Sequence, residues 1–304
     1  MIKVGILEAA TAHGAELVRI LLNHPDVQLE WAQSSVAQGA LSSTVRGIAG
    51  DTAMNFCRLP LAPVDVIINC SPVPVSAESV AAIATDPAKV RIIETAATES
   101  PDTYVYGLCE LNRKALVRGA MTARPVSPLA MAVELALLPL AKHLLLNSPV
   151  SVAATVGTNG PRAISRRAGG MLPECEEIAS AMRLAQSSFF QPVDIVEMRC
   201  GGTEGLMAVV SVQCSMPVGE VRPLYEKCYD DHNFVFISAD PIDTRDVLGT
   251  NKCLLHVDKD GDTLRVTAVL DPRVKGAAGN TVHILNLMSG LHERTGLAMK
   301  ANPE

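Results

Sequence analysis

The sequence lacks a surplus of positive charge. Its 26 lysines and arginines are outnumbered by 32 aspartates and glutamates, which gives a net charge of −6. A nucleic-acid-binding surface needs clustered basic residues, and the only short basic cluster consists of Arg162, Arg166 and Arg167. We interpret that cluster as a solvated loop, and we expect no nucleic-acid partner.

The sequence also lacks a long apolar run and paired cysteines. No run approaches the roughly 20 residues that a membrane span needs, because residues 135–146 include Pro139, Lys142 and His143. The eight cysteines form no CxxC pair, and their spacing suits neither a zinc site nor a disulfide framework. The N-terminus reads as a strand and not as a secretory signal. We therefore expect no metal, no membrane association and a reduced, cytoplasmic compartment.

Strand-like and helix-like segments alternate over the first part of the chain. The apolar patterns predict strands at 3–7, 27–32, 64–70 and 90–94, and helices at 14–22 and 76–84. Strands without clean alternation, separated by helices, are typical of a parallel sheet covered on both faces. The sequence therefore predicts an α/β fold whose first domain is Rossmann-like, with a doubly wound parallel sheet.

The pattern changes after Pro125. It predicts a helix at 130–145, strands at 150–156, 193–199, 206–214, 253–258 and 263–270, and helices at 221–229 and 280–291. A Lys259-Asp260-Gly261 turn marks a hairpin between the last two strands. We expect a second, α+β domain over 128–279 with a mainly antiparallel sheet, and a first domain formed by 1–127 plus 280–304.

The turn after the first strand stands where a dinucleotide fingerprint belongs. Its candidate cofactor contacts are Ala9, Ala10, Thr11, His13 and Gly14. Gly14 is the only glycine of the fingerprint present, and Glu8 and Thr11 hold the first two glycine positions. A side chain at either position takes room that the pyrophosphate needs, and a carboxylate repels it. The alternatives are a plain turn with Glu8 solvated and a working phosphate site.

Several longer stretches carry a family resemblance. They are MIKVGIL, GAELVRILLNHPDV, VYGLCELNRKAL, ALLPLAKHLLLN, GTNKCLLHVDKDGDTL and VKGAAGNTVHILNLMSGLHERTGL. Together they cover nearly the whole chain and resemble N-acetyl-γ-glutamyl-phosphate reductases of arginine biosynthesis. The resemblance implies an NADP cofactor, with Ser34 and Ser35 near the adenosine 2′-phosphate and Gly276 in the cofactor site. It also implies reduction of an acyl phosphate through a cysteine thioester, with a histidine as acid and base.

The chain departs from that family at the residues that carry the chemistry. The cysteine position holds Ser127 when counted from Arg124, and Pro128 when counted back from the apolar helix. The histidine position holds Met171, and a substrate-binding arginine is replaced by Glu204. The segments Glu94-Thr95-Ala96-Ala97 and Asp271-Pro272 also differ from the family pattern. Cys109 and Cys175 are alternative nucleophiles, although we expect buried thiols, and we expect His13 and His143 to be surface or packing residues.

These departures predict a non-catalytic paralogue that acts as a binding or regulatory partner, with weak or absent NADP binding. We expect a homo-oligomer formed through the sheet of the second domain, and an active reductase paralogue is a further candidate partner. Two alternatives stay open. One is an NADPH-dependent reductase with a rearranged site, and the other is an enzyme of different chemistry that reuses the cleft.

Overall fold

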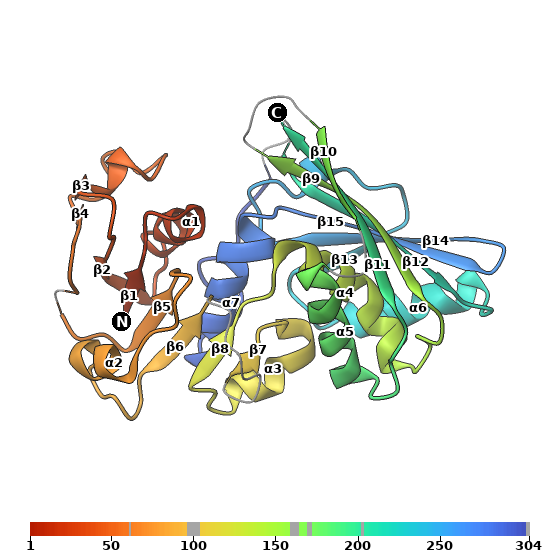
Figure 1. Ribbon diagram of the computed structural model, residues 1–304, viewed down its shortest axis with the longest axis horizontal. Helices are drawn as coiled ribbons and strands as arrows, with labels where there is room; N and C mark the ends of the chain where they lie inside the picture. The colour runs from red at the N-terminus through yellow and green to blue at the C-terminus, as the bar shows by residue number, and fades with distance from the viewer. Residues whose placement is uncertain (61, 96–103, 159–163, 169–171, 202–203, 302–304) are drawn as a thin grey trace. The chain divides into compact units, whose positions relative to one another are not determined.

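The computed structural model describes residues 1–60, 62–95, 104–158, 164–168, 172–201 and 204–301 (Figure 1). The chain divides into two compact units. The first is Met1–Val126 with Ala277–Ala298, and the second is Ser127–Gly276 with the residues from Met299 onward. The sequence placed the two junctions at residues 127/128 and 279/280. It assigned the end of the chain to the first domain, whereas the residues after Ala298 group with the second unit.

The first unit is built on a parallel sheet in the order β2-β1-β5-β6-β8-β7. Its strands are β1 (Ile2–Leu7), β2 (Val27–Ala32), β5 (Val66–Asn69), β6 (Arg91–Glu94), β7 (Val105–Tyr106) and β8 (Thr122–Arg124). A small antiparallel pair, β3 (Gly39–Ala40) and β4 (Asn55–Phe56), lies outside it. Every residue of β5 is buried, as expected for a strand covered on both faces. This arrangement confirms the predicted Rossmann-like fold.

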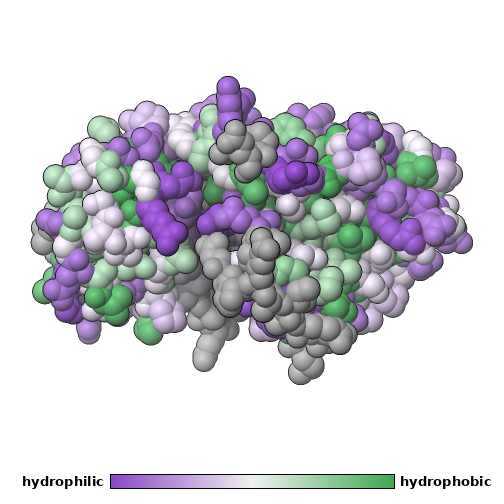
Figure 2. Space-filling model, turned by 90° about the horizontal axis from the view of Figure 1, so that it is seen from above, coloured by the Kyte–Doolittle hydropathy of each residue, from purple (hydrophilic) through white to green (hydrophobic). Residues whose placement is uncertain are grey.

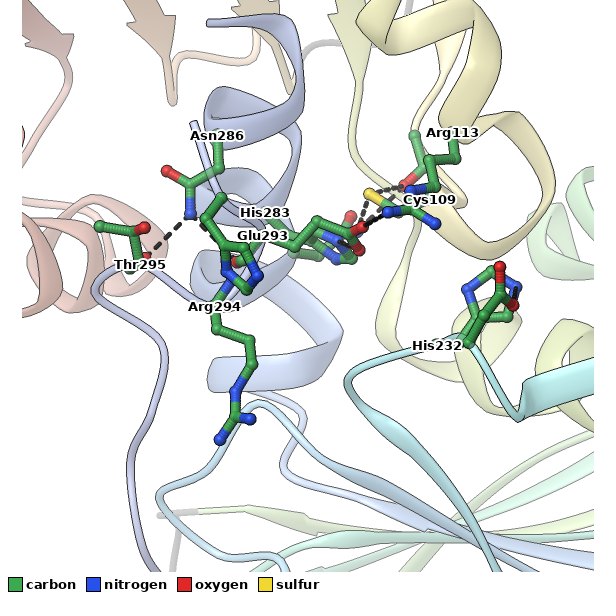
Figure 3. Close-up of polar contacts among 12 residues, drawn as sticks. Cys109, Arg113, His232, His283, Asn286, Glu293, Arg294 and Thr295 are labelled. Carbon is green, nitrogen blue, oxygen red and sulfur yellow. Dashed lines mark hydrogen bonds and ion pairs between the residues drawn. The ribbon is translucent and has the colours of Figure 1, made fainter. Parts of the chain in front are cut away.

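The helices of the first unit include the last helix of the chain. They are α1 (Ala12–Leu21), α2 (Ala77–Ile83), α3 (Cys109–Val117) and α7 (Gly279–Met288). All residues of α7 are buried, and it contacts α1, α3 and β6. The segment after α7 is held by polar contacts, because Asn286 donates to the Thr295 carbonyl at 2.9 Å and Glu293 binds both His283 and Arg113 (Figure 3).

The single tryptophan of the chain, Trp31, packs inside the first unit. Its ring lies over Gly5 of β1 so closely that a Cβ atom there would come within 2.1 Å of it. The indole N–H donates to the Ala62 carbonyl at 2.8 Å, so the polar atom of this buried ring is satisfied. Trp31 thus joins β1 and β2 to the segment before β5.

The second unit is built on a mixed sheet in the order β10-β11-β9-β12-β15-β14-β13. Its strands are β9 (Val150–Thr158), β10 (Ile164–Ala168), β11 (Val193–Gly201), β12 (Leu206–Gln213), β13 (Val235–Ser238), β14 (Cys253–Asp260) and β15 (Thr263–Leu270). Neighbouring strands are antiparallel except in the β11–β9 and β13–β14 pairs. The mainly antiparallel sheet is therefore confirmed, although the sequence did not predict β10 or β13.

Three helices of the second unit lie on one side of this sheet (Figure 1). They are α4 (Pro128–Lys142), α5 (Pro173–Ala185) and α6 (Val218–Tyr229). Helix α4 contains Pro139, which has no N–H for the Leu135 carbonyl. The Tyr229 hydroxyl of α6 donates to that carbonyl at 2.5 Å, which replaces the missing helical bond. Among the residues described, no helix is both long and apolar enough to cross a membrane.

Among the described residues of the second unit, no α-helix lies on the other face of its sheet (Figure 1). Backbone pairing aligns one residue from each of six neighbouring strands in a row across it: Met198, Thr155, Met207, Val269, Leu254 and Phe236. Apart from Thr155, every residue of this row is apolar. Val269 is fully buried within the chain, whereas Met198 and Phe236, at the two ends of the row, are 39% and 44% exposed. Figure 2 shows the molecule from above, with hydrophobic and hydrophilic residues interspersed and no single wide apolar patch. We call the six residues the open-face row.

Candidate functional site

The turn between β1 and α1 keeps a backbone shape that favours glycine. Glu8 has a φ of 52°, which is left-handed and rare for a residue with a side chain. Such a conformation costs roughly 1–2 kcal/mol. The Glu8 amide donates to Gln33 Oε1 at 3.0 Å, which helps to hold the turn. The turn therefore has the backbone conformation that a glycine would adopt, but the residue in it, Glu8, carries a carboxylate.

The Glu8 carboxylate lies on a backbone amide at the end of β2. Both of its oxygens are 3.2 Å from the Ser35 nitrogen, which donates to them. The neighbouring Ser34 is buried, and its hydroxyl accepts from the amides of Val36 and Ala37 at 3.2 and 2.9 Å. The Ser34 hydroxyl and the Ser35 amide at this candidate 2′-phosphate position are thus bound by the chain itself, while Ser35 is exposed.

Thr11 and Gly14 determine how α1 begins. Thr11 is the N-cap residue, and its hydroxyl accepts from the Gly14 amide at 3.1 Å and donates to the Glu8 carbonyl at 3.0 Å. A free helix N-terminus would offer such amides to an anion. A Cβ atom on Gly14 would lie 2.6 Å from Ala9 Cα, so only glycine fits this contact. Gly14 therefore serves the close packing of helix on strand that the last fingerprint glycine provides.

His13 faces α7 within the same unit. Its Nε2 lies 3.0 Å from the Thr281 hydroxyl, which itself donates to the Ala277 carbonyl at 3.1 Å. The histidine is therefore the donor in this pair. Burial lowers the pKa of His13 to about 4. Neutral His13 links α1 to α7, and Ala9 and Ala10 complete the turn before it, with Ala9 fully buried.

The ends of β5 and β6 carry a buried amide–carboxylate pair. Asn69 Nδ2 donates to Glu94 at 2.8 Å and to the Val73 carbonyl at 2.8 Å. The other Glu94 oxygen accepts from the Val75 amide at 3.1 Å, and the Thr95 hydroxyl donates to the Asn69 carbonyl at 2.7 Å. Asn69 and Glu94 therefore fix the segment 71–75, and Thr95 joins the end of β6 to Asn69. Residues 96 and 97 of the predicted loop lie outside the described residues.

Ser127 is the N-cap residue of α4, but its hydroxyl does not cap the helix. It donates to Glu177 Oε2 at 2.6 Å, while the Ser127 amide donates to Glu177 Oε1 at 3.0 Å. Glu177 belongs to α5, a helix that the sequence reading did not predict. One carboxylate thus binds both donors of the residue at a candidate nucleophile position.

The second candidate for the nucleophile position, Pro128, is the first residue of α4. Its ring has neither a nucleophilic atom nor an N–H. A Cβ atom on Gly276 would lie 2.8 Å from Pro128 Cβ, so the structure brings Gly276 against this residue. Met171, at the predicted acid–base position, lies outside the described residues.

Glu204 and the Asp271-Pro272 segment, which also differ from the family pattern, lie in the second unit. Glu204 forms an ion pair of 3.2 Å with Arg273. The buried carboxylate of Asp271 accepts from the amides of Gly249, Arg273 and Val274 at 2.7, 2.8 and 3.2 Å. Asp271 therefore shapes the chain that leads into the π-helical turn Val274–Ala278.

The alternative cysteine nucleophiles are buried thiols. Cys109 and Cys175 are 1% and 5% exposed. Burial raises the pKa of Cys175, and it raises the pKa of Cys70, near Thr11, to about 12. Because the thiolate is the nucleophilic form, neither Cys175 nor Cys70 has the environment of an activated cysteine.

Comparisons with known proteins agree with this architecture. Residues 3–118 match the family model "Semialdehyde dehydrogenase, NAD binding domain", and residues 172–271 match "Semialdehyde dehydrogenase, dimerisation domain". The N-acetyl-gamma-glutamyl-phosphate reductases of Parabacteroides distasonis and Phocaeicola vulgatus are 34% and 35% identical to this chain, over 99% of it and 99% of each relative. The chain belongs to the N-acetyl-γ-glutamyl-phosphate reductase family.

Membership of this reductase family confirms the resemblance that the sequence stretches indicated. It also identifies the first unit as an NAD-binding type of domain. The crystal structure of aspartate semialdehyde dehydrogenase II from Vibrio cholerae complexed with ASA is similar, with a TM-score of 0.73 over 95% of this chain and 98% of that one. Since the two are only 14% identical, this likeness shows the fold alone.

Proposed function

We propose that this reductase-family chain does not reduce an acyl phosphate and serves instead as a binding or regulatory subunit. The bond from the Ser127 hydroxyl to Glu177 carries the proposal. A cysteine is partly thiolate at neutral pH, whereas a serine hydroxyl is a weak nucleophile. The Glu177 carboxylate also places negative charge beside the position where an anionic acyl phosphate would have to approach, and like charges repel.

The turn after β1 supports a loss of dinucleotide binding. Glu8 holds the Ser35 amide and Thr11 holds the Gly14 amide, so two N–H donors are already bound. Glu8 adds a negative charge where a pyrophosphate would have to lie. These residues do not fit an NADP phosphate group, and we derive no hydride-transfer step through that cofactor.

The third difference concerns the histidine that transfers protons in the family. A general acid or base of suitable pKa typically contributes about 10²–10⁴-fold to a rate. The family histidine position holds Met171, which has no titratable proton. His13 belongs to the turn before α1, and it is neutral and bonded to Thr281. Losses of nucleophile, proton carrier and cofactor site together support a non-catalytic role.

The open-face row supports assembly as the retained property. The six residues cross the sheet of the second unit on the side that carries no helix of that unit, and that unit matches a dimerisation-domain model. Apolar side chains in the middle of a sheet face are stabilised when a second sheet covers them. We propose that two or more copies of this chain associate through this face. A catalytically intact reductase with the same fold is an alternative partner.

An active reductase with a rearranged site is the alternative. The observation that favours it is the same 2.6 Å bond, since Glu177 is positioned to accept the Ser127 proton. The Ser127 oxygen would then form an oxygen ester in place of a thioester. An oxygen ester accepts hydride less readily, which is why we prefer the non-catalytic proposal.

An NADPH assay on purified protein separates the two proposals. We expect no detectable reduction of N-acetyl-γ-glutamyl phosphate, and none in reverse from the semialdehyde with NADP and phosphate. Ser127→Cys alone and Ser127→Cys with Met171→His should also remain inactive while Glu8 occupies the turn. Robust wild-type turnover that disappears in Ser127→Ala would overturn the proposal and make Ser127 a nucleophile.

A further inference from the structure

A cavity of about 410 Å³ opens at the edge of the first unit's parallel sheet where the strands begin. Its lining includes Ile2 at the start of β1, Asp65 just before β5 and Arg91 at the start of β6. The turn that carries Glu8 follows β1 and lies at the opposite edge, where the strands end. The volume is within the roughly 300–1,000 Å³ typical of small-molecule pockets. This cavity is therefore separate from the candidate cofactor turn.

Arg91 brings to this cavity a positive charge that no described residue neutralises. Its half-buried side chain forms no ion pair with the described residues, and its Nε is shielded from solvent without a hydrogen-bond partner among them. A buried donor that lacks a partner costs about 1–3 kcal/mol. A modest rotation of the guanidinium would present Nε and one Nη atom together to a carboxylate, which arginine binds in this two-pronged geometry.

Asp65 brings a negative charge to the same cavity. Its Oδ2 accepts from the Lys3 amide at 3.0 Å, and its Oδ1 is bound by none of the described residues. Asp65 and Arg91 lie at the starts of neighbouring strands but form no ion pair with each other. The other two charged residues of the described lining, Lys89 and Asp86, pair with each other at 3.2 Å. One cation and one anion thus remain unpaired in the cavity.

Ser289 adds a polar group beside these two charges. It follows the last residue of α7, and its hydroxyl oxygen is shielded from solvent with no hydrogen-bond partner among the described residues. A serine hydroxyl can accept as well as donate a hydrogen bond. The carbonyl groups at the C-terminus of a helix also stabilise a nearby cation. Ser289 and Asp65 together therefore offer acceptors to an ammonium group.

We propose that this cavity binds a free α-amino acid with an apolar side chain. The carboxylate lies on Arg91, and the ammonium lies between Asp65 and Ser289. The apolar side chain packs against Ile2 and Val90, which line the same cavity.

The two unpaired charges of the lining select a zwitterion. A simple anion would meet the Asp65 carboxylate, and a simple cation would meet the Arg91 guanidinium, whereas a zwitterion complements both. The inference goes beyond the proposed function, because binding at this edge of the sheet holds whether or not the chain is catalytic.

Calorimetric titration of the full chain with three probes tests the inference. L-leucine carries both charges, N-acetyl-L-leucine lacks the ammonium and L-leucinamide lacks the carboxylate. We expect L-leucine to bind with a dissociation constant on the order of 100 µM. The other two should bind at least about tenfold more weakly, because each leaves one charge of the cavity without a partner.

Variants of the lining locate the binding. Arg91→Met should weaken L-leucine binding at least about tenfold, and Asp65→Asn should reduce the preference for L-leucine over N-acetyl-L-leucine. Arg46→Met is the matched control, since it removes an exposed arginine outside the cavity and should leave L-leucine binding unchanged.

The ranking of the probes on the wild type decides the matter even if Arg91→Met does not fold. No L-leucine binding, or equal binding of either derivative, would overturn the inference. Unchanged L-leucine binding by a folded Arg91→Met variant would also overturn it. The NADPH assay tests the proposed function alone, so the two conclusions can fail separately.

Discussion

Glu177 accepts hydrogen bonds from both the hydroxyl and the amide of Ser127, which joins α5 to the start of α4. A parallel relationship exists in the first unit, where Glu8 accepts from the Ser35 amide at the end of β2. In each case a glutamate side chain binds a backbone donor at a position where the family resemblance implies an anionic group. At both positions, therefore, a carboxylate of the chain itself accepts from the donor.

Removing the Glu177 carboxylate should destabilise the second unit. We expect Glu177→Ala to lower the free energy of unfolding by about 1–2 kcal/mol, because a half-buried charged acceptor of two hydrogen bonds is lost. The Ser127 hydroxyl is then free to cap α4, which offsets part of the loss. Urea unfolding followed by far-UV circular dichroism measures the change.

Glu176→Ala is the matched control. Its side chain is largely exposed and pairs with Arg183 on the surface of the same helix, so we expect a change within about 0.5 kcal/mol. Equal effects of the two substitutions would contradict a specific role for Glu177.

Glycine at position 14 should be required for the fold. We expect Gly14→Ala to destabilise the first unit by about 2 kcal/mol or more, since the new Cβ would lie 2.6–2.8 Å from Ala9 backbone atoms. The control is Gly219→Ala in α6, where a Cβ meets nothing within 4 Å. That change should be neutral or stabilising by up to about 1 kcal/mol. If Gly14→Ala were as stable as the wild type, α1 would have to shift away from Ala9 without loss of stability, which would contradict the prediction.

His13 should make the protein less stable in acid. Its pKa is lowered by burial from 6.5 to about 4. Between these values the unfolded chain binds a proton that the folded chain does not, so stability falls as the pH drops from 6.5 towards 4. Because the side chain is partly exposed, we expect a loss of about 1–2 kcal/mol over this range.

The variant His13→Gln keeps a donor for Thr281 and removes the titrating group. We expect the free energy of unfolding to fall less between about pH 7 and about pH 4.5 in the variant than in the wild type. Part of the difference should persist, because burial also lowers the pKa of His24. The control is His143→Gln, which changes an exposed histidine. If His13→Gln lost as much free energy of unfolding in acid as the wild type, His13 would not be a cause of the acid sensitivity.

The open-face row should mediate assembly. We expect light scattering at tens of micromolar to report a dimer or larger species for the wild type, and Met207→Lys to reduce its mass, since charges are depleted from interface centres. Leu184→Lys on α5 is the control, because this residue is 62% exposed and lies on a helix of the covered face. A monomeric wild type would contradict assembly.

The sequence was sufficient for the longer strands and for the helices other than α3 and α5, but it did not predict β3, β4, β7, β8, β10 or β13. Runs such as 27–32 and 253–258 are short, apolar and bounded by turn residues, so local pattern predicted them. The sequence does not predict helix α5, because Cys175, Ala179 and Ala181 are small residues whose apolar spacing is weak. The sequence alone left the family's cysteine position open between Ser127 and Pro128.

The partner of Ser127 could not be predicted in the same way. Glu177 lies 50 positions away, and their contact depends on how α5 packs against α4. The left-handed backbone of Glu8 was implied by the glycine position that it occupies. Its bond to Ser35 was not, since it requires the parallel register of β1 and β2. Tertiary contacts of this kind decide the chemistry of both sites.

Trp31 allows unfolding of the first unit to be followed separately by tryptophan fluorescence. The only indole of the chain is buried over Gly5 in the first unit, and the second unit has none. Intrinsic tryptophan emission therefore reports the solvent exposure of the first unit alone, while far-UV circular dichroism reports both. A denaturation curve recorded by the two probes will coincide if the units unfold together, and will separate if either unit melts first.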